Sequence, residues 1–208
     1  MVTRLKTRPL LYETVLAAVG GAVCCSRLAM EGTPAFALVR PPGHHADQRG
    51  SWGFCYVNNM AVAVRRLLQD KGVRWVVILD LDHHVGDGTQ RIFRSDSRVS
   101  VINILEATRE DYLAQVQNTL RIIRKTDVLA VSLGFDTYEW DLGGLLKTED
   151  YALLGKMLRQ GAERLCRGRR FALLEGGYYL PDLGENALAF CRGFGQAYGA
   201  GRPLSVVS

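Results

Sequence analysis

The chain has 208 residues, of which 48% are hydrophobic and 23% charged, with a formal net charge of +5. This is the composition of an ordinary soluble globular protein, and no linker, low-complexity tract or repeat divides it, so one α/β domain over residues 1–208 is expected. The basic residues are scattered, without a basic stripe and interleaved aromatics, which argues against nucleic-acid binding.

The N-terminal region has three basic residues, Arg4, Lys6 and Arg8, before an uncharged stretch over residues 14–26, which imitates a signal peptide. Glu13 interrupts the apolar region, and the uncharged stretch is too short to span a bilayer. A buried Ala/Gly-rich helix without a membrane role is therefore predicted. The five cysteines form no CxxC pair and are expected to be core residues in a reducing compartment.

Helical patterns alternate with short apolar runs along the chain. The predicted elements are a helix at 10–30, a strand at 35–39, a helix at 58–70, strands at 75–79 and 99–104, a helix at 109–125, a strand at 128–133, a helix at 149–166, a strand at 171–174 and a helix at 185–198. Thr108 and Thr148 mark helix starts because acidic residues follow them. The alternation predicts an open, mostly parallel sheet with helices on both faces.

Polar residues follow four of the predicted strands, in the segments RPPGHHA, DLDHHVGDG, GFD and EGGYY. Taken singly, each is typical of a turn or helix cap. Because ligands bind at the carboxyl ends of parallel strands, the four segments are expected to meet in one crevice. They contribute His44, His45, Asp80, Asp82, His83, His84, Asp87, Asp136 and Tyr178.

The second of these segments contains the best candidate metal ligands. In an extended backbone Asp80, Asp82 and His84 point to one side and His83 to the other. Asp82 and His84, with Asp136 from a neighbouring strand end, leave a coordination position open for water, as catalytic zinc sites do. Such oxygen-rich ligation also suits other divalent metals.

The remaining residues suggest acid–base catalysis. Asp80 can orient a neighbouring imidazole by accepting its N–H. His44 and His45 arrive on a loop stiffened by Pro41-Pro42, and Asp87 is a second spare carboxylate. Two His–Asp pairs beside a metal-bound water suit hydrolysis.

The segments RPPGHHA, GFCYVNN, DLDHHVGDGTQ, SLGFD and LEGGYY, in this order, resemble the histone deacetylase superfamily, including bacterial acetylpolyamine amidohydrolases and acetoin-utilisation proteins. The resemblance runs from about residue 10 to residue 195, in a shortened form. It implies an arginase/deacetylase-like fold and zinc-dependent hydrolysis of the amide in an acetylated lysine, amine or polyamine.

The resemblance also implies roles for individual residues. Zinc would be held by Asp82, His84 and Asp136, and a structural potassium ion by Asp80, Asp82 and His84 with backbone carbonyls. His45, partnered by Asp87, would be the base, and His44, partnered by Asp80, its electrostatic partner. Tyr178 would stabilise the oxyanion, and Gly53, Phe54 and Gly177 would line the substrate tunnel.

One departure concerns the ligand histidine. The family usually has a hydrophobic or aromatic residue before it and another histidine after it, whereas here His83 precedes and Val85 follows His84. A one-residue slip would make His83 the ligand, but it breaks the i, i+2 alternation.

A second departure is length. The H-P-E-R-like segment and the F-P-G-T-G loop of the family are missing, so a shallow, open pocket is expected, in either a natural minimal form or a fragment with an exposed sheet edge.

The alternative to a deacetylase is a catalytically inactive metal- or acyl-binding regulatory protein. A homo-oligomer could rebuild the rim, and a bacterial cytoplasmic location is expected. An arginase-like enzyme would need two metal ions, and the sequence offers no ligand set for the second one.

Overall fold

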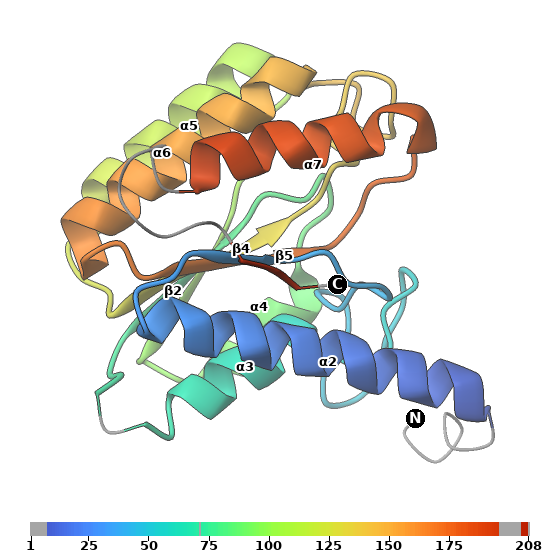
Figure 1. The fold of residues 1–208 in the computed structure, drawn as a ribbon, viewed down its shortest axis with the longest axis vertical. Helices are drawn as coiled ribbons and strands as arrows, with labels where there is room; N and C mark the ends of the chain where they lie inside the picture. The colour runs from blue at the N-terminus through green and yellow to red at the C-terminus, as the bar shows by residue number, and fades with distance from the viewer. Residues whose placement is uncertain (1–7, 71, 196–204, 208) are drawn as a thin grey trace.

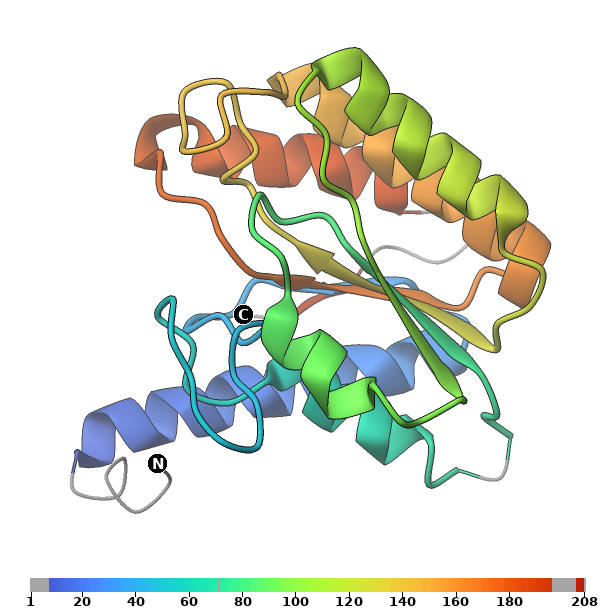
Figure 2. The same cartoon turned by 180° about the vertical axis from the view of Figure 1, so that it is seen from behind.

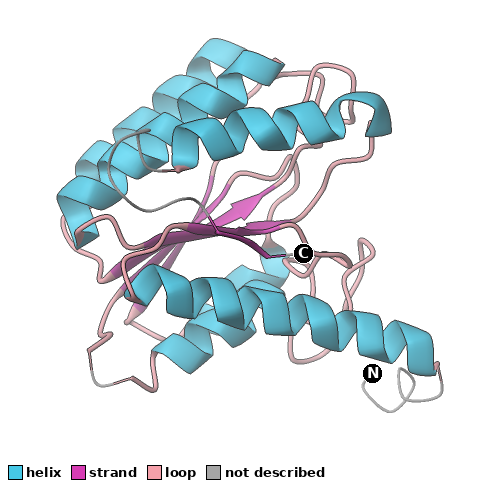
Figure 3. Ribbon diagram, in the orientation of Figure 1, coloured by secondary structure: helices cyan, strands magenta, loops and turns pink. Residues whose placement is uncertain are grey.

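The structure is a computed structural model that describes residues 8–70, 72–195 and 205–207. Its elements are α2 (Pro9–Met30), β1 (Ala35–Ala37), α3 (Asn59–Leu67), β2 (Val76–Asp80), α4 (Asp87–Phe93), β3 (Val99–Asn103), α5 (Arg109–Ile122), β4 (Val128–Leu133), α6 (Thr148–Cys166), β5 (Arg170–Leu174), α7 (Leu180–Phe194) and β6 (Ser205–Val207). Figure 3 shows how helices and strands alternate along the chain.

The described strands form one six-stranded sheet in the order β3-β2-β4-β5-β1-β6, and every pair is parallel. Helices α5, α6 and α7 cover one face, and α2, α3 and α4 cover the other (Figures 1 and 2). The predicted open parallel sheet with helices on both faces is confirmed. In register, Asp80 at the end of β2 lies beside Asn103 of β3 and Ser132 of β4.

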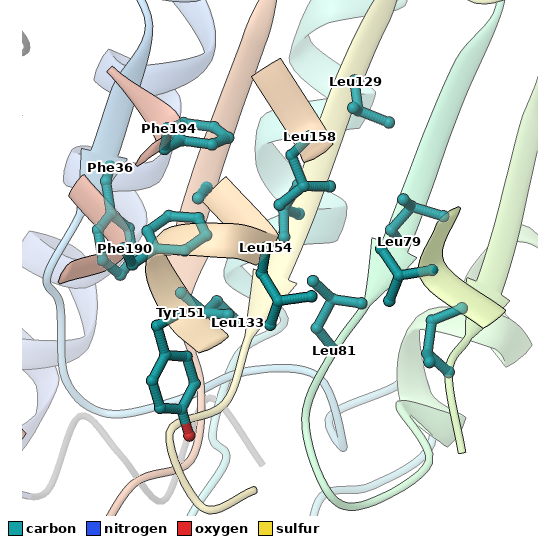
Figure 4. Packing of buried hydrophobic residues seen from close by; sticks show 14 of the residues in the cluster. Phe36, Leu79, Leu81, Leu129, Leu133, Tyr151, Leu154, Leu158, Phe190 and Phe194 are labelled. Carbon is teal, nitrogen blue, oxygen red and sulfur yellow. The ribbon is translucent and has the colours of Figure 1, made fainter. Parts of the chain in front are cut away.

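The core is divided by the sheet into two apolar clusters. Leu79 and Leu133 pack toward α5–α7, together with Phe36, whose ring meets Phe190 edge-on at 5.2 Å (Figure 4). Ile78 packs on the opposite side with α2 and α3. Every residue of β2, β4 and β5 is buried, which explains why these strands are nearly continuous apolar runs rather than alternating ones. The exceptions are the buried residues Asp80, Ser132 and Arg170.

Two of the predicted helix starts can be compared directly. Thr108 is the N-cap of α5, and its hydroxyl accepts the backbone N–H of Asp111 at 3.1 Å, as predicted. Helix α6 starts at Thr148, but its cap is Lys147, whose backbone N–H donates to Asp150 Oδ2 at 2.8 Å. In both helices acidic residues in the first turn complement the positive end of the helix dipole.

Two short elements were not predicted, and several predicted boundaries were wrong: β1 ends at Ala37 and not at 39, α3 at Leu67 and not at 70, and α5 at Ile122 and not at 125. Helix α4 has seven residues and starts in a Gly-Asp-Gly sequence that is typical of a turn, and β6 has three residues. Helix α7 begins at Leu180, five residues before the predicted start, because Pro181 is compatible with a first helical turn. Residues 196–198 of the predicted helix lie outside the described residues.

Helix α2 is, by length and composition alone, the one helix of the described residues able to cross a membrane. The prediction that the apolar stretch was too short rested on residues 14–26, whereas the helix has 22 residues. Its buried side, which includes Ala18, Ala22 and Cys25, packs against β1 and α3, and core helices of globular proteins meet the same criterion. Cys24 is exposed, so the prediction that all five cysteines are core residues was wrong for it.

Candidate active site

The tails of β2, β4 and β5 are joined by hydrogen bonds to buried carboxylates. Asp82 Oδ2 accepts the backbone N–H of Gly176 at 2.8 Å, and Asp136 Oδ1 accepts that of His83 at 3.1 Å. These bonds connect segments that are 94 and 53 residues apart in the sequence. The tails that were expected to meet at the carboxyl edge of the sheet therefore do meet.

Asp82, His84 and Asp136 form a group that could hold a metal ion, with one ligand atom from each residue within 4.8 Å of the others. His84 Nδ1 lies 3.0 Å from Asp136 Oδ2 and 3.2 Å from Asp82 Oδ1. Both carboxylates are buried, whereas 39% of the His84 side chain is exposed. Two buried carboxylates and one half-exposed imidazole match the donor set of a catalytic metal site with room for a further ligand.

Two glycines make room for this group. A Cβ on Gly134 would lie 2.3 Å from Asp82 Oδ2, and a Cβ on Gly176 would lie 2.6 Å from Asp136 Cγ. No side chain fits at either position without moving a carboxylate. The glycines of the GFD and EGGYY segments thus allow the backbone to approach the ligand group closely.

The electrostatics of the ligand group favour a cation. Burial, and then repulsion by the charge of Asp82, raise the pKa of Asp136 to about 7. Two carboxylates this close resist simultaneous ionisation unless positive charge is supplied. The donor set therefore fits a divalent cation.

His44 and Asp80 form the first predicted His–Asp pair, with His44 Nδ1 3.2 Å from Asp80 Oδ2. Both residues are buried, and His44 Nε2 lies 3.8 Å from Asp82 Oδ1. Burial opposes the charged form, but the adjacent Asp80 carboxylate outweighs it and raises the pKa of His44 to about 10. His44 thus brings positive charge to the edge of the ligand group.

His45 and Asp87 form the second predicted pair, with His45 Nδ1 2.8 Å from Asp87 Oδ1. Burial and the neighbouring His44, whose ring centroid is 4.0 Å away, lower the pKa of His45, against the opposing effect of Asp87. Because Nδ1 contacts the carboxylate, Nε2 is the ring nitrogen left for proton transfer. The surroundings of the two neighbouring histidines therefore raise the pKa of His44 and lower that of His45.

His83 and His84 lie on different sides of their segment, as the alternation predicted. His83 is exposed and lines a separate hollow with Ile104, Leu105 and other residues after β3. His84 is the one placed between Asp82 and Asp136. Both histidines lie after β2, which ends at Asp80, so their opposite directions do not depend on strand pairing.

A cavity of about 430 Å³ opens beside the ligand group. This volume lies within the usual range of ligand pockets. The residues that line it are Pro42, His44, His45, Trp52, Gly53, Phe54, His84, Leu142, Gly176 and Tyr178. Gly177, predicted in the tunnel, is not among these lining residues; its φ of +130° turns the backbone immediately before Tyr178.

Tyr178 is held through its backbone. Asp141 Oδ2 accepts the N–H groups of both Tyr178 and Tyr179 at 2.6 Å, and the Arg40 guanidinium donates to the carbonyl of Gly177. The Tyr178 ring faces Phe54, with centroids 6.1 Å apart. Burial, and then the carboxylates of the ligand group, raise the pKa of Tyr178, so its hydroxyl keeps its proton.

Sequence reasoning missed three residues that organise the site: Trp52, Asp141 and Glu175. Glu175 begins the EGGYY segment, and its position directly after a buried strand was an available signal. Trp52 directly precedes the GFC segment, but nothing in the local pattern indicates its contacts. Asp141 lies in a loop whose path depends on the whole fold.

Comparisons with known proteins identify the family of the chain. A model of the histone deacetylase domain matches residues 4–112, just over half of the chain. The chain is 32% identical over 224 residues to a probable deacetylase of Archaeoglobus fulgidus, covering 88% of this chain and 62% of that protein. It is 32% identical over 216 residues to the acetylpolyamine amidohydrolase of Burkholderia pseudomallei, covering 86% and 61%.

The crystal structure of the acetylpolyamine aminohydrolase from Burkholderia pseudomallei matches with a TM-score of 0.75 at 29% sequence identity, covering 85% of this chain and 61% of that one. The chain spans about three fifths of the length of these relatives. The family model, the similar sequences and the similar fold agree, and the chain belongs to the histone deacetylase family.

Proposed function

We propose that this protein is a zinc-dependent deacetylase that hydrolyses the amide of an acetylated lysine or of an acetylated amine or polyamine. The observation that carries the proposal is the placement of Asp82, His84 and Asp136 next to the two His–Asp pairs in one cavity. The relatives named deacetylase and acetylpolyamine amidohydrolase support the same substrate class.

Zinc held by Asp82, His84 and Asp136 would supply Lewis-acid activation of the acyl carbonyl and of water. His45 Nε2 takes the proton of the attacking water and later gives it to the nitrogen of the leaving amine. Asp87 holds the opposite ring nitrogen at 2.8 Å and keeps the imidazole oriented throughout.

His44 and Tyr178 stabilise charge in this scheme. His44 Nε2, 3.8 Å from Asp82 Oδ1, adds an N–H dipole at the edge of the site, oriented by Asp80 behind it. The Tyr178 hydroxyl donates to the carbonyl oxygen as it becomes an oxyanion, a role in which the loss of one donor costs about 100- to 1,000-fold in rate.

The substrate side chain is expected to pass between apolar walls. Phe54 is 72% exposed and Trp52 54% exposed, and both line the cavity with Leu142. Such walls suit the methylene chain of an acyl-lysine or acyl-polyamine, and Gly53 lets the backbone beside Trp52 approach His45 closely. The chain therefore has more than one aromatic wall, although only Phe54 was predicted.

Zinc content and hydrolysis of an acetyl-lysine reporter test the proposal in the wild type, His45→Ala and Tyr178→Phe. One zinc per chain with turnover that is lost in His45→Ala and reduced about 100-fold or more in Tyr178→Phe is expected. Bound zinc without wild-type turnover would instead support the alternative of a regulatory metal- or acyl-binding protein. Acetylated polyamine assayed in parallel separates the two substrate types.

Three other predictions belong to this proposal. A potassium ion would be held near Asp80, Asp82 and His84 by oxygen ligands. Self-association would complete the rim of the cavity, and a cytoplasmic location is expected. Activity with and without potassium, and the mass in solution, test the first two.

A further inference from the structure

Trp52 covers the catalytic pair from outside. Its ring stacks on that of His45 with a centroid separation of 3.7 Å and an interplanar angle of 28°. The His44 ring lies 4.0 Å from the same imidazole, so His45 is packed between two rings. His45 is 4% exposed, whereas Trp52 is 54% exposed. The indole is thus a surface residue packed directly against a buried catalytic imidazole.

The backbone after Trp52 is shaped for this close approach. Gly53 and Phe54 both have positive φ, +56° and 62°. A Cβ on Gly53 would lie 2.4 Å from His45 Cδ2, which excludes any other residue there. Phe54 adopts a conformation that is rare for an aromatic residue, and such strain persists where the surrounding structure determines it.

Trp52 also contacts the partner of His45. Its Nε1–H donates to both oxygens of Asp87, each at 3.2 Å. Asp87 therefore receives His45 on Oδ1, Arg91 on Oδ2 at 2.9 Å, and the indole across both. An indole N–H only donates and sits on a rigid ring, so it fixes the carboxylate without competing for the proton.

We propose that Trp52 is a positioning residue of the proposed deacetylase, which orients Asp87 through its indole N–H and shields the His45–Asp87 hydrogen bond from water through its stacked ring. The expected effect on kcat rests on the proposed function. The orientation of Asp87 and the shielding of its hydrogen bond rest on geometry alone. If Trp52 only lined the cavity, its ring would matter and its N–H would not. Trp52→Phe separates these two roles, because phenylalanine keeps an aromatic ring for stacking and removes the N–H donor.

The kinetic test is a double-mutant cycle between Trp52→Phe and Asp87→Ala, assayed on the acetyl-lysine reporter. Loss of a hydrogen bond that orients a catalytic group typically costs about tenfold or more in activity. Trp52→Phe is therefore expected to lower kcat about tenfold with little change in KM, and to have less than a twofold effect when Asp87 is already Ala. Trp140→Phe is the matched control, because Trp140 is 66% exposed and is absent from the described lining of the cavity. It should leave both constants within twofold.

A second readout does not depend on activity. In ¹⁵N-histidine-labelled protein the His45 Nδ1 proton, assigned by its loss in His45→Gln, should exchange slowly with water. Its exchange should accelerate at least tenfold in Trp52→Ala and less in Trp52→Phe, while Trp140→Phe leaves it unchanged. Unchanged exchange in Trp52→Ala, or a full kinetic loss in the Asp87→Ala background, would overturn the inference. Absence of wild-type turnover counts against the proposed function alone, and the exchange rates still decide the role of Trp52.

Discussion

The buried carboxylate of Glu175 accepts a hydrogen bond from the backbone N–H of His44. Glu175 Oε2 accepts the backbone N–H of His44 at 3.1 Å and that of Gly43 at 2.8 Å. Its other oxygen accepts the hydroxyl of Ser132 at 2.9 Å. A side chain directly after β5 thus fixes the loop that carries His44 and His45 to Ser132 of β4.

Removal of this carboxylate is expected to affect folding and activity together. Glu175→Ala leaves two buried N–H groups without acceptors, and each unsatisfied group typically costs about 1–3 kcal/mol. Urea unfolding should show a loss of that order or more, with reporter turnover falling in parallel. Glu175→Gln keeps an acceptor oxygen and should lose less. Exposed Glu185 is the control, and equal losses in Glu185→Ala and Glu175→Ala would contradict the role.

The adjacent histidines allow a matched test of the metal site. His84→Ala removes a ligand atom from the group with Asp82 and Asp136 and should abolish zinc binding. His83→Ala keeps the backbone N–H that Asp136 accepts and should retain one zinc per chain. Metal analysis after dialysis measures both. Zinc retained by His84→Ala and lost by His83→Ala would mean that the ligand position is shifted by one residue.

Thermal unfolding gives an independent check of the same site. A ligand that binds only the folded state stabilises it by RT ln(1 + [L]/Kd), about 2.7 kcal/mol at 100 times Kd. Zinc should therefore raise the Tm of the wild type and of His83→Ala, and a chelator should reverse the increase. His84→Ala should show no zinc-dependent shift. A shift of equal size in all three proteins would indicate that zinc binds elsewhere.

The sheet could be predicted from the sequence because each central strand is buried on both faces. The runs at β2, β4 and β5 are apolar apart from Asp80, Ser132 and Arg170, and their polar tails follow at once, so strand type and site location were both encoded locally. The alternation that placed Asp82 and His84 together is also local. Helix α4 was missed because Gly86-Asp87-Gly88 is typical of a turn, and its seven residues give too short a pattern.

The supporting contacts could not be predicted because they join distant segments. Trp52 and Asp87 are 35 residues apart, and Asp141 and Tyr178 are 37 apart. Nothing in either local pattern indicates that the partners meet, since the contact exists only once the strand ends are side by side. Tertiary packing, rather than propensity, decides such pairs.

Acid pH is expected to weaken a surface network that precedes β3. Hydrogen bonds from Arg98 at 2.9 and 2.8 Å hold the pKa of Asp96 well below its usual 3.8, with further help from Arg65 of α3. The unfolded chain therefore takes up this proton first as the pH falls. The contribution of Asp96 is complete above 3.8 and is lost as the pH falls toward the folded-state pKa.

The comparison of wild type with Asp96→Asn measures this effect. Near neutral pH the wild type should be more stable by less than about 1 kcal/mol, as for an exposed ion pair, and less so in high salt. The difference in unfolding free energy should shrink below 3.8. A difference that stays constant over this range would show that Asp96 acts through packing rather than charge.

Asp141 is expected to place the tyrosine hydroxyl, because one of its oxygens accepts the backbone N–H groups of Tyr178 and Tyr179 at 2.6 Å. Asp141→Ala frees the segment after Gly177, and misplacement of a reacting group by about 1 Å can cost about 100-fold in rate. We therefore expect kcat to fall about 10- to 100-fold, with partial rescue in Asp141→Asn, which retains an acceptor oxygen. Glu139→Ala, on the same loop, should stay near wild type. Because Asp141 acts through the hydroxyl, Asp141→Ala should cost much less in a Tyr178→Phe background, and an undiminished cost there would assign Asp141 to loop stability instead.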